Sequence, residues 1–298
     1  MPDSPPSKDP VITSSGGSHG FYETLGFVDT IRLCAQSLGI KMHPQSRLLR
    51  FEQQLIRLGS MKIGEIKNTD FDFVTFTEGN RDVFEIAFIC RTLSRLFPDE
   101  IGKVLKPLLD GAPLPSDDAR TFARDMQFES YFAALFAHSG FEVILKEPDL
   151  IFEHEGTWYG VAAKRLSSAD QLEKRVREAI SQLEKARLRG LVALSADRLL
   201  PGETPRVVAL SEKALDDAGS ELMLKVLKTH GPTIFPLMTH PSVVGLIVNL
   251  VVPARMANTP GDIGATTVLR ILPRPDDQGT NELTISINNR LKGPHAIV

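Results

Sequence analysis

Apolar residues recur at helical spacing through the first third of the chain. Residues 27–38, 48–58 and 83–96 each place apolar side chains three and four positions apart, which is the spacing of a helix with one buried face. Residues 71–77 alternate and include β-branched side chains, which favours a short strand or a turn. The pattern therefore predicts a helical N-terminal domain over residues 21–112.

The pattern changes after residues 108–118, where a glycine, two prolines and acidic residues are typical of a linker. Beyond it the predicted order is one helix, three strands, a helix and a strand, which is α/β in character. These elements are predicted at residues 117–138, 141–147, 148–155, 157–164, 168–189 and 191–196. We therefore expect an α/β domain over residues 113–298, with its core at 117–200.

Turn residues support these limits. Gly140 and Gly190 follow the two helices, as glycine commonly does, and Glu155-Gly156 is a tight-hairpin signal between the second and third strands. After residue 206 the chain continues in the same manner, with a short β run, a helix, a long apolar strand and two further apolar runs. They are predicted at residues 207–210, 211–229, 243–252, 268–272 and 282–287.

Composition places the chain among globular proteins, since 42% of its 298 residues are hydrophobic and 24% are charged. Residues 1–20 are rich in proline, serine and glycine and contain no apolar stretch, which predicts a disordered tail rather than a signal peptide. The longest apolar run, 243–252, is too short to span a membrane as a helix. Cys34 and Cys90 are expected to be free, buried thiols in a reducing compartment. These features favour a cytoplasmic protein.

Two short motifs lie on the second and third predicted strands. Pro148-Asp149 opens the second strand, and Ala162-Ala163-Lys164 closes the third. With the order of elements around them, these motifs resemble the PD-(D/E)xK nuclease superfamily, which includes restriction-endonuclease-like and RecB-like enzymes. Arg165 completes a VAAKR sequence that is similar to the common xECKR form of the motif. The resemblance covers residues 117–200 and implies an αβββαβ core.

The resemblance also implies a metal-dependent catalytic site. Asp149 would bind Mg²⁺ or Mn²⁺, and Lys164 would be a catalytic residue beside the ion. Phosphodiester hydrolysis needs carboxylates to hold a metal that polarises the phosphate and activates a water molecule. A lysine beside the metal can orient or deprotonate that water and stabilise charge on the phosphorus.

Glu129 supports this interpretation from the residue pattern itself. It lies in the middle of an apolar stripe on the helix predicted at 117–138, among Phe122, Met126, Phe132, Ala133 and Phe136. A carboxylate there loses hydration, at a cost that a metal ion, an arginine or a backbone amide would offset. Members of the superfamily commonly carry a glutamate on this helix, so the resemblance implies that Glu129 is a catalytic metal ligand.

One position departs from the superfamily pattern, because Ala162 stands where the second acidic ligand is expected. Three alternatives follow. The missing carboxylate can come from the next helix, where Glu173 flanks the apolar face and Glu178 lies on the far side from it. Glu129 and Asp149 can instead hold one metal ion together with the carbonyl of Ala163. In the third alternative the site is degenerate and does not cleave.

The helix predicted at 168–189 carries the remaining candidates. Gln182 resembles a glutamine that assists the active site in some RecB-like members, although a solvated glutamine on a helix face fits equally well. Residues 164–189 include eight basic and four acidic residues, in a chain of net charge −3. Such a surface would attract a nucleic-acid backbone, but an ordinary helix surface with internal ion pairs has the same composition. The candidate nucleic-acid contacts are Arg165, Lys174, Arg175 and Arg177.

The sequence is thus expected to encode a metal-dependent nuclease that acts on nucleic acid, with DNA as the expected substrate and no membrane partner. Its helical N-terminal domain would select the substrate or bind a protein partner or a second copy of the chain. The main alternative is a PD-(D/E)xK fold that has lost cleavage and serves as a nucleic-acid-binding or assembly module. A third hypothesis, a helical interaction protein with an α/β appendix, predicts that Asp149 and Lys164 are exposed and far apart.

Overall fold

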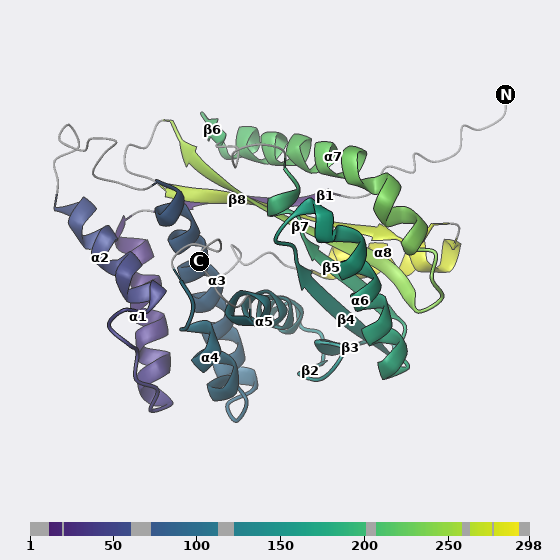
Figure 1. The fold of residues 1–298 in the computed structure, drawn as a ribbon, viewed down its shortest axis with the longest axis horizontal. Helices are drawn as coiled ribbons and strands as arrows, with labels where there is room; N and C mark the ends of the chain where they lie inside the picture. The colour runs from purple at the N-terminus through teal and green to yellow at the C-terminus, as the bar shows by residue number, and fades with distance from the viewer. Residues whose placement is uncertain are drawn as a thin grey trace.

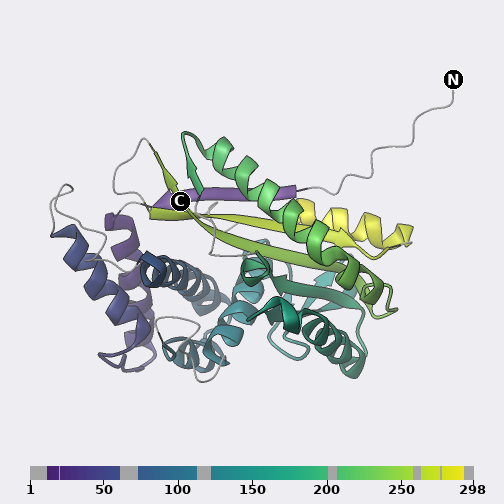
Figure 2. The ribbon, with the colours of Figure 1, turned by 45° about the horizontal axis from the view of Figure 1, so that its top comes forward.

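A mixed sheet of eight strands runs through the molecule and carries helices on both of its faces (Figures 1 and 2). The computed structural model describes residues 12–19, 21–60, 73–112, 122–200, 207–257, 263–275 and 277–291. The strands are β1 Ile12–His19, β2 Val143–Ile144, β3 Leu150–His154, β4 Thr157–Arg165, β5 Gly190–Ser195, β6 Val207–Ala209, β7 Val243–Met256 and β8 Ile263–Pro273. The helices are α1 Phe21–Ser37, α2 Arg47–Gly59, α3 Phe73–Leu96, α4 Ile101–Leu108, α5 Phe122–His138, α6 Leu172–Ala186, α7 Glu212–Leu237 and α8 Gln278–Arg290. The α/β class predicted from the sequence is therefore confirmed.

The strands β4, β5 and β7 are parallel, and antiparallel strands flank them on both sides. The order across the sheet is β1, β8, β7, β5, β4, β3, β2, and β6 pairs with β7 outside this path. All six residues of β5 are buried, as is typical of a parallel strand that is covered on both faces. The β3–β4 hairpin joins this parallel centre through the pairing of β4 with β5.

Alternate residues of the central strands face two separate apolar cores. Leu191 and Ala193 of β5 belong to the core that includes residues of α1 to α5 and α8. Val192 and Leu194 belong to the core that includes residues of α6 and α7. This alternation follows from the two-residue period of a strand, so the position of a residue on β4 or β5 determines which core its side chain faces.

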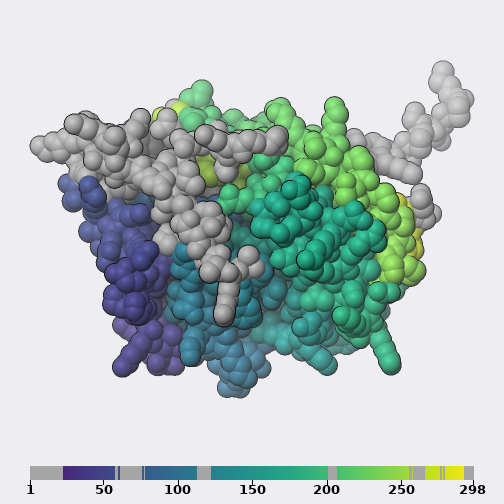
Figure 3. Space-filling view, in the orientation of Figure 1, coloured from purple at the N-terminus to yellow at the C-terminus, as the bar shows by residue number. Residues whose placement is uncertain are grey.

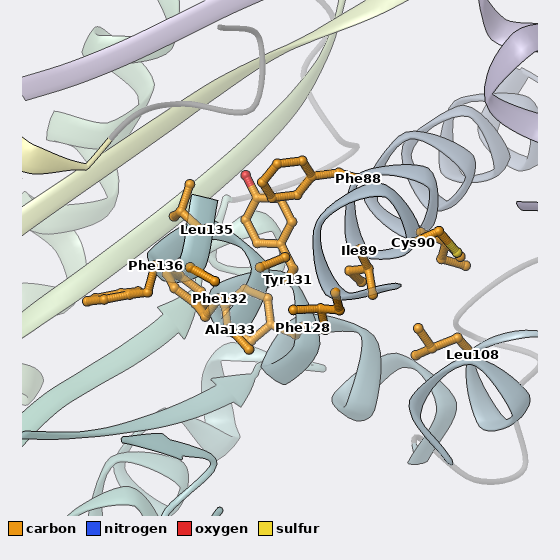
Figure 4. Close-up of a cluster of buried hydrophobic side chains, with 14 of the residues drawn as sticks. Phe88, Ile89, Cys90, Leu108, Phe128, Tyr131, Phe132, Ala133, Leu135 and Phe136 are labelled. Atoms are coloured by element: carbon orange, nitrogen blue, oxygen red, sulfur yellow. The ribbon is translucent and has the colours of Figure 1, made fainter. Parts of the chain in front are cut away.

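The N-terminal helices share the first of these cores with the sheet. Phe88 and Ile89 of α3 lie in the same buried cluster as Phe128 and Tyr131 of α5 (Figure 4). The ring centroids of Phe88 and Tyr131 are 5.7 Å apart. The N-terminal helices, purple to blue, occupy one end of the molecule, and the green elements occupy the other (Figure 3). Helix α5 therefore packs against the N-terminal helices as well as against the sheet.

Buried ionised groups also join α2, α3 and α5. The Asp82 carboxylate accepts hydrogen bonds from Arg47 at 2.9 Å and from Arg124 at 3.0 Å, and only 2% of the Asp82 side chain is exposed. Burial acts to raise the pKa of Asp82, but the guanidinium groups of Arg47 and Arg124 outweigh it, so the pKa lies below its ordinary value. We call these groups the Asp82 network.

The predicted order of helix, three strands, helix and strand is found between α5 and β5. Glu155 and Gly156 form the turn between β3 and β4 with φ angles of 51° and 78°, as a two-residue hairpin with left-handed central residues requires. Gly140 follows α5 with a φ of 80°. Helix α6 is shorter than predicted, because Arg187 adopts a left-handed conformation directly after it.

Two local predictions are wrong. Residues 12–19, expected in a disordered tail, form β1 and pair with β8, because a distant strand supplies hydrogen-bond partners that local composition does not reveal. Residues 73–77, expected in a strand or turn, lie in α3, and the remainder of that run is outside the described residues. The apolar run at 282–287 lies in α8.

None of the described helices combines the length and the apolar composition that crossing a membrane requires.

Candidate active site

The β3–β4 hairpin brings Asp149 and Lys164 into direct contact. Asp149 immediately precedes β3, and Lys164 lies near the end of β4. The Lys164 ammonium is 3.3 Å from Oδ2 of Asp149, and the backbone N–H of Ala163 donates to the same oxygen at 2.6 Å. Exposed fractions of 6% for the Asp149 side chain and 11% for that of Lys164 place the pair at a buried position. The hypothesis that required the two residues to be exposed and far apart is therefore wrong.

Glu129 enters this site from α5. Burial is the main cause that raises its pKa to about 8, and the charge of Asp149 adds to the rise, whereas the Lys164 ammonium opposes it. Among the described residues, Glu129 forms no ion pair. At neutral pH the Glu129 carboxyl group therefore carries its proton, which an ion of double positive charge would displace.

The groups around the Asp149 carboxylate have opposite effects on its pKa. Burial raises its pKa to about 6, the Lys164 ammonium and the Ala163 N–H lower it, and the charge of Glu147 raises it. Two carboxyl groups thus share one buried lysine and still have raised pKa values. Burial is the largest cause of both raised pKa values, and the charges of neighbouring carboxyl groups add to it.

Glu147 and Gln182 complete the surroundings of Asp149. The side-chain amide of Gln182, on α6, lies 3.4 Å from Oδ1 of Asp149 and 3.4 Å from the Glu147 carboxylate. The structure therefore places Gln182 beside Asp149 and Glu147. Glu147 was not among the residues singled out from the sequence. The available signal was its place next to the Pro148-Asp149 pair.

The structure shows why an acidic residue does not occupy position 162. The Ala162 side chain is fully buried and belongs to the apolar core that α6 and α7 cover, whereas Ala163 belongs to the opposite core. An acidic side chain at 162 would have to enter the packing between β4 and α6. Position 162 is therefore closed by apolar packing.

We predict that Ala162→Glu destabilises the protein by about 3–5 kcal/mol, because it buries a charge and overpacks the core. It should not create or increase metal-dependent cleavage. Urea denaturation measures the first effect, with the exposed Thr157→Glu on the same strand as the control. An Ala162→Glu protein of unchanged stability would contradict this description of the site.

The two glutamates considered as substitutes for the missing ligand are engaged elsewhere. Glu173 accepts a hydrogen bond from Arg177 at 2.7 Å, and Glu178 accepts one from Arg175 at 3.0 Å. More than half of the Glu173 side chain is exposed, as is 39% of the Glu178 side chain. Neither glutamate is among the main causes of the raised pKa values of Glu129 and Asp149. Both are paired with arginines of α6 itself, and the approach of one of them to the site stays a prediction.

The residues predicted from the sequence to contact nucleic acid differ in exposure: one is buried, and three lie on the surface of α6. Arg165 faces the core opposite to Lys164, and its guanidinium group lies 4.0 Å from Glu78 with 10% of the side chain exposed. Burial and the neighbouring Arg81 lower the pKa of Arg165. Its assignment to an exposed contact surface is wrong, because successive side chains on β4 point to opposite faces.

The remaining three contacts lie on α6 and are accessible. Lys174 and Arg177 expose 77% and 62% of their side chains, whereas Arg175 exposes 27%. Their ion pairs with Glu173 and Glu178 span three or four residues of the helix and contribute little to stability. These basic side chains are therefore free to exchange their partners for phosphate groups.

The oxygen ligands available to a metal are few. Within the described residues, no group of three or more histidine, cysteine, aspartate and glutamate side chains is arranged to hold a metal ion. The Ala163 carbonyl, another predicted ligand, accepts a hydrogen bond from Lys164 at 3.0 Å. A site for Mg²⁺ needs only one or two carboxylates when water and substrate phosphate complete its coordination. Glu129 and Asp149 satisfy that smaller requirement.

None of the protein-family models, curated proteins and solved structures with which the chain was compared matches it.

Proposed function

We propose that this protein is a metal-dependent nuclease of the PD-(D/E)xK type, which hydrolyses phosphodiester bonds in DNA. The observation that supports the proposal most strongly is the buried contact between Asp149 and Lys164, with Glu129 close enough to raise its pKa in response to Asp149. A buried carboxyl pair with perturbed pKa values beside a lysine is typical of a catalytic site. The order of α5, β2, β3, β4, α6 and β5 around it also agrees with the superfamily core.

Asp149 and Glu129 are the residues that would hold Mg²⁺ or Mn²⁺. When bound, the ion would polarise the scissile phosphate and lower the pKa of a water molecule. The two carboxyl groups support this assignment, since their pKa values are raised despite the nearby ammonium. Such an ion would also share with Lys164 the role of lowering the pKa of Asp149.

The side chains of the protein have separate roles in this proposal. The Lys164 ammonium, held between Asp149 and the carbonyl of Ala163, would stabilise negative charge that develops on the phosphate oxygens. The Ala163 N–H fixes one oxygen of Asp149, and Gln182 contacts the other. Gln182 is therefore a positioning residue, and Glu147 adds negative charge at the same place.

A catalytically inactive nucleic-acid-binding module is the second candidate. Ala162 supports it, because the position that commonly carries an acidic ligand is closed by apolar packing. The limited set of carboxylates among the described residues supports it as well. The two candidates share the accessible basic face of α6 and differ only in whether metal ions lead to cleavage.

Cleavage assays separate the two candidates. The full chain is incubated with supercoiled plasmid, single-stranded DNA and RNA of matched length, each with Mg²⁺, Mn²⁺ or EDTA. A nuclease should nick or degrade at least one substrate with a metal ion and leave all of them intact in EDTA. If the protein binds nucleic acid but cleaves none of the substrates with any metal ion, the nuclease proposal is wrong and the inactive binding module is favoured.

Binding should depend steeply on salt, because each phosphate contact releases counterions. We predict that Arg175→Ala and Arg177→Ala together reduce the slope of log affinity against log salt by about one unit per lost contact. Fluorescence anisotropy with labelled DNA measures this slope. The double substitution of Lys213 and Lys225 by alanine on α7 is a matched control, since both lysines also form ion pairs with residues four positions away. Equal slopes for the two double variants would exclude α6 as the binding face.

A further inference from the structure

The two cysteines of the chain meet where α1 packs against α3. Cys34 of α1 and Cys90 of α3 line the same groove, and the Cys34 sulfur lies 3.3 Å from the hydroxyl oxygen of Ser94 on α3. Both cysteines are free in the structure. Cys90 is buried in the core shown in Figure 4, but Cys34 is only half-buried, which corrects the expectation that both thiols would be buried. The Cys34 side chain is therefore partly accessible, whereas Cys90 is buried.

A groove gives access to this pair. It has a volume of about 400 Å³, and its lining includes both cysteines together with Thr30, Arg91 and Arg95. The Arg91 guanidinium is held 5.4 Å from the centre of the Phe27 ring and 3.4 Å from the hydroxyl of Thr30. Both arginines line the groove and carry positive charge. Partial exposure beside positive charge is the environment in which protein thiols react.

We propose that this groove is an oxidation site in which Cys34 reacts with a hydroperoxide and Cys90 resolves the product as an intramolecular disulfide. The site is separate from the proposed nuclease centre and does not depend on it. Its substrate class is a small hydroperoxide, such as hydrogen peroxide, that fits the groove.

The proposed reaction is balanced in two steps. The Cys34 thiolate attacks one peroxide oxygen, so that a sulfur–oxygen bond forms, the oxygen–oxygen bond breaks and the other oxygen leaves as water or an alcohol after taking a proton. The Cys90 sulfur then attacks the Cys34 sulfur of the sulfenic acid. A sulfur–sulfur bond forms, and the hydroxyl group leaves as water with the Cys90 proton. The two thiols lose two electrons in total, and the peroxide gains them.

The surroundings assign different roles to the two cysteines. The hydrogen bond from Cys90 lowers the pKa of Cys34 to about 6, and the contact with Ser94 acts in the same direction, against the effect of burial. The bond to Cys34 and burial both raise the pKa of Cys90. Cys34, which is half-buried, is therefore assigned the attack on the peroxide, and the buried Cys90 is assigned the second step.

The test uses the full reduced chain, treated with hydrogen peroxide and then denatured in N-ethylmaleimide for intact-mass analysis. The chain has only two cysteines, so an intramolecular disulfide can join only this pair. We expect reduced protein to take up two maleimides, whereas oxidised monomer should take up none and weigh two hydrogens less. Retention of two alkylatable thiols, or disulfide-linked dimers in place of the oxidised monomer, would overturn the proposal.

Two single variants test the assigned roles. In Cys90→Ala, oxidation should stop at a sulfenic acid on Cys34 that dimedone traps. In Cys34→Ala, Cys90 should react at least about tenfold more slowly than Cys34 does in the natural chain, because it is buried and protonated. Circular dichroism establishes that both variants are folded. Rapid oxidation of Cys90 in the folded Cys34→Ala protein would reverse the assignment and contradict the proposal.

Discussion

Substitution of Asp149 by asparagine is expected to abolish metal-dependent cleavage and to leave the protein folded. The change removes the negative charge that a divalent cation requires. Even residues that only hydrogen-bond to a metal ligand typically change metal affinity or activity by ~10–100-fold when they are mutated. We therefore expect a loss of more than ~100-fold in the cleavage rate. Asparagine keeps an oxygen that accepts from the Ala163 N–H, and Asp149 is a buried group whose pKa is raised to about 6. For these reasons the substitution should not lower the stability.

DNA binding gives the second measurement for the same variant. Asp149→Asn removes a negative charge near the proposed phosphate position, so its affinity for DNA should equal or exceed that of the natural chain. Glu142→Gln is the matched control, since Glu142 is an exposed carboxylate just before β2 and should change neither property. Full cleavage activity in Asp149→Asn would remove Asp149 from the mechanism.

A large loss of stability is expected from Asp82→Ala. This substitution leaves the Arg47 and Arg124 guanidinium groups buried without the carboxylate that both contact. Breaking a buried ion pair by removing one partner typically costs about 3–5 kcal/mol, because an uncompensated charge stays behind. Urea denaturation followed by circular dichroism measures the free energy of unfolding. Asp29→Ala is the control, since Asp29 forms an exposed ion pair with Arg32 and should change stability by less than about 0.5 kcal/mol.

The contribution of Asp82 to the free energy of unfolding should also decrease at low pH. The pKa of Asp82 in the folded protein is below its ordinary value of 3.8, so the folded state binds a proton less readily than the unfolded state. The stabilisation is therefore fully present above pH 3.8 and is lost as the pH falls through the folded pKa. The difference between the natural chain and Asp82→Ala should shrink in that range. A constant difference down to low pH would show that Asp82 acts through packing alone.

Local sequence patterns predicted the elements around the site because those elements are bounded by local signals. The turn at Glu155 and Gly156 and the glycine after α5 need no information from distant residues. Strand β1 could not be predicted in this way, since Ile12–His19 is paired with β8, which lies at the other end of the chain. Its polar composition indicates disorder until the distant partner strand is considered.

The candidate site was predicted in part for the same reason. Asp149 and Lys164 lie on one hairpin, so their contact follows from a local turn and its register. The burial of Arg165 was implied by alternation along β4, but its ionic neighbours come from α3 and could not be identified from a local pattern. The apolar surroundings of Ala162 likewise come from α6 and α7. Glu147 was missed because no periodic pattern marks it.

The raised pKa values of the two carboxyl groups give the central claim a thermodynamic signature. Glu129 has a pKa of about 8 and is protonated at pH 7, so a divalent cation that binds there must displace a proton. Metal affinity should consequently rise between pH 6 and pH 8. Glu129→Gln should weaken binding and reduce this proton release, because glutamine has no proton to lose and Asp149, with its pKa raised to about 6, is the remaining source.

Calorimetric titration of the natural chain with Mn²⁺ at pH 7, in two buffers of different ionisation enthalpy, tests most directly whether Glu129 and Asp149 together hold a metal ion. The expected result is saturable binding with release of protons, strongly weakened in Asp149→Asn and accompanied by less proton release in Glu129→Gln. Absence of Mn²⁺ binding by the natural chain, or binding that both substitutions leave unchanged, would contradict the claim.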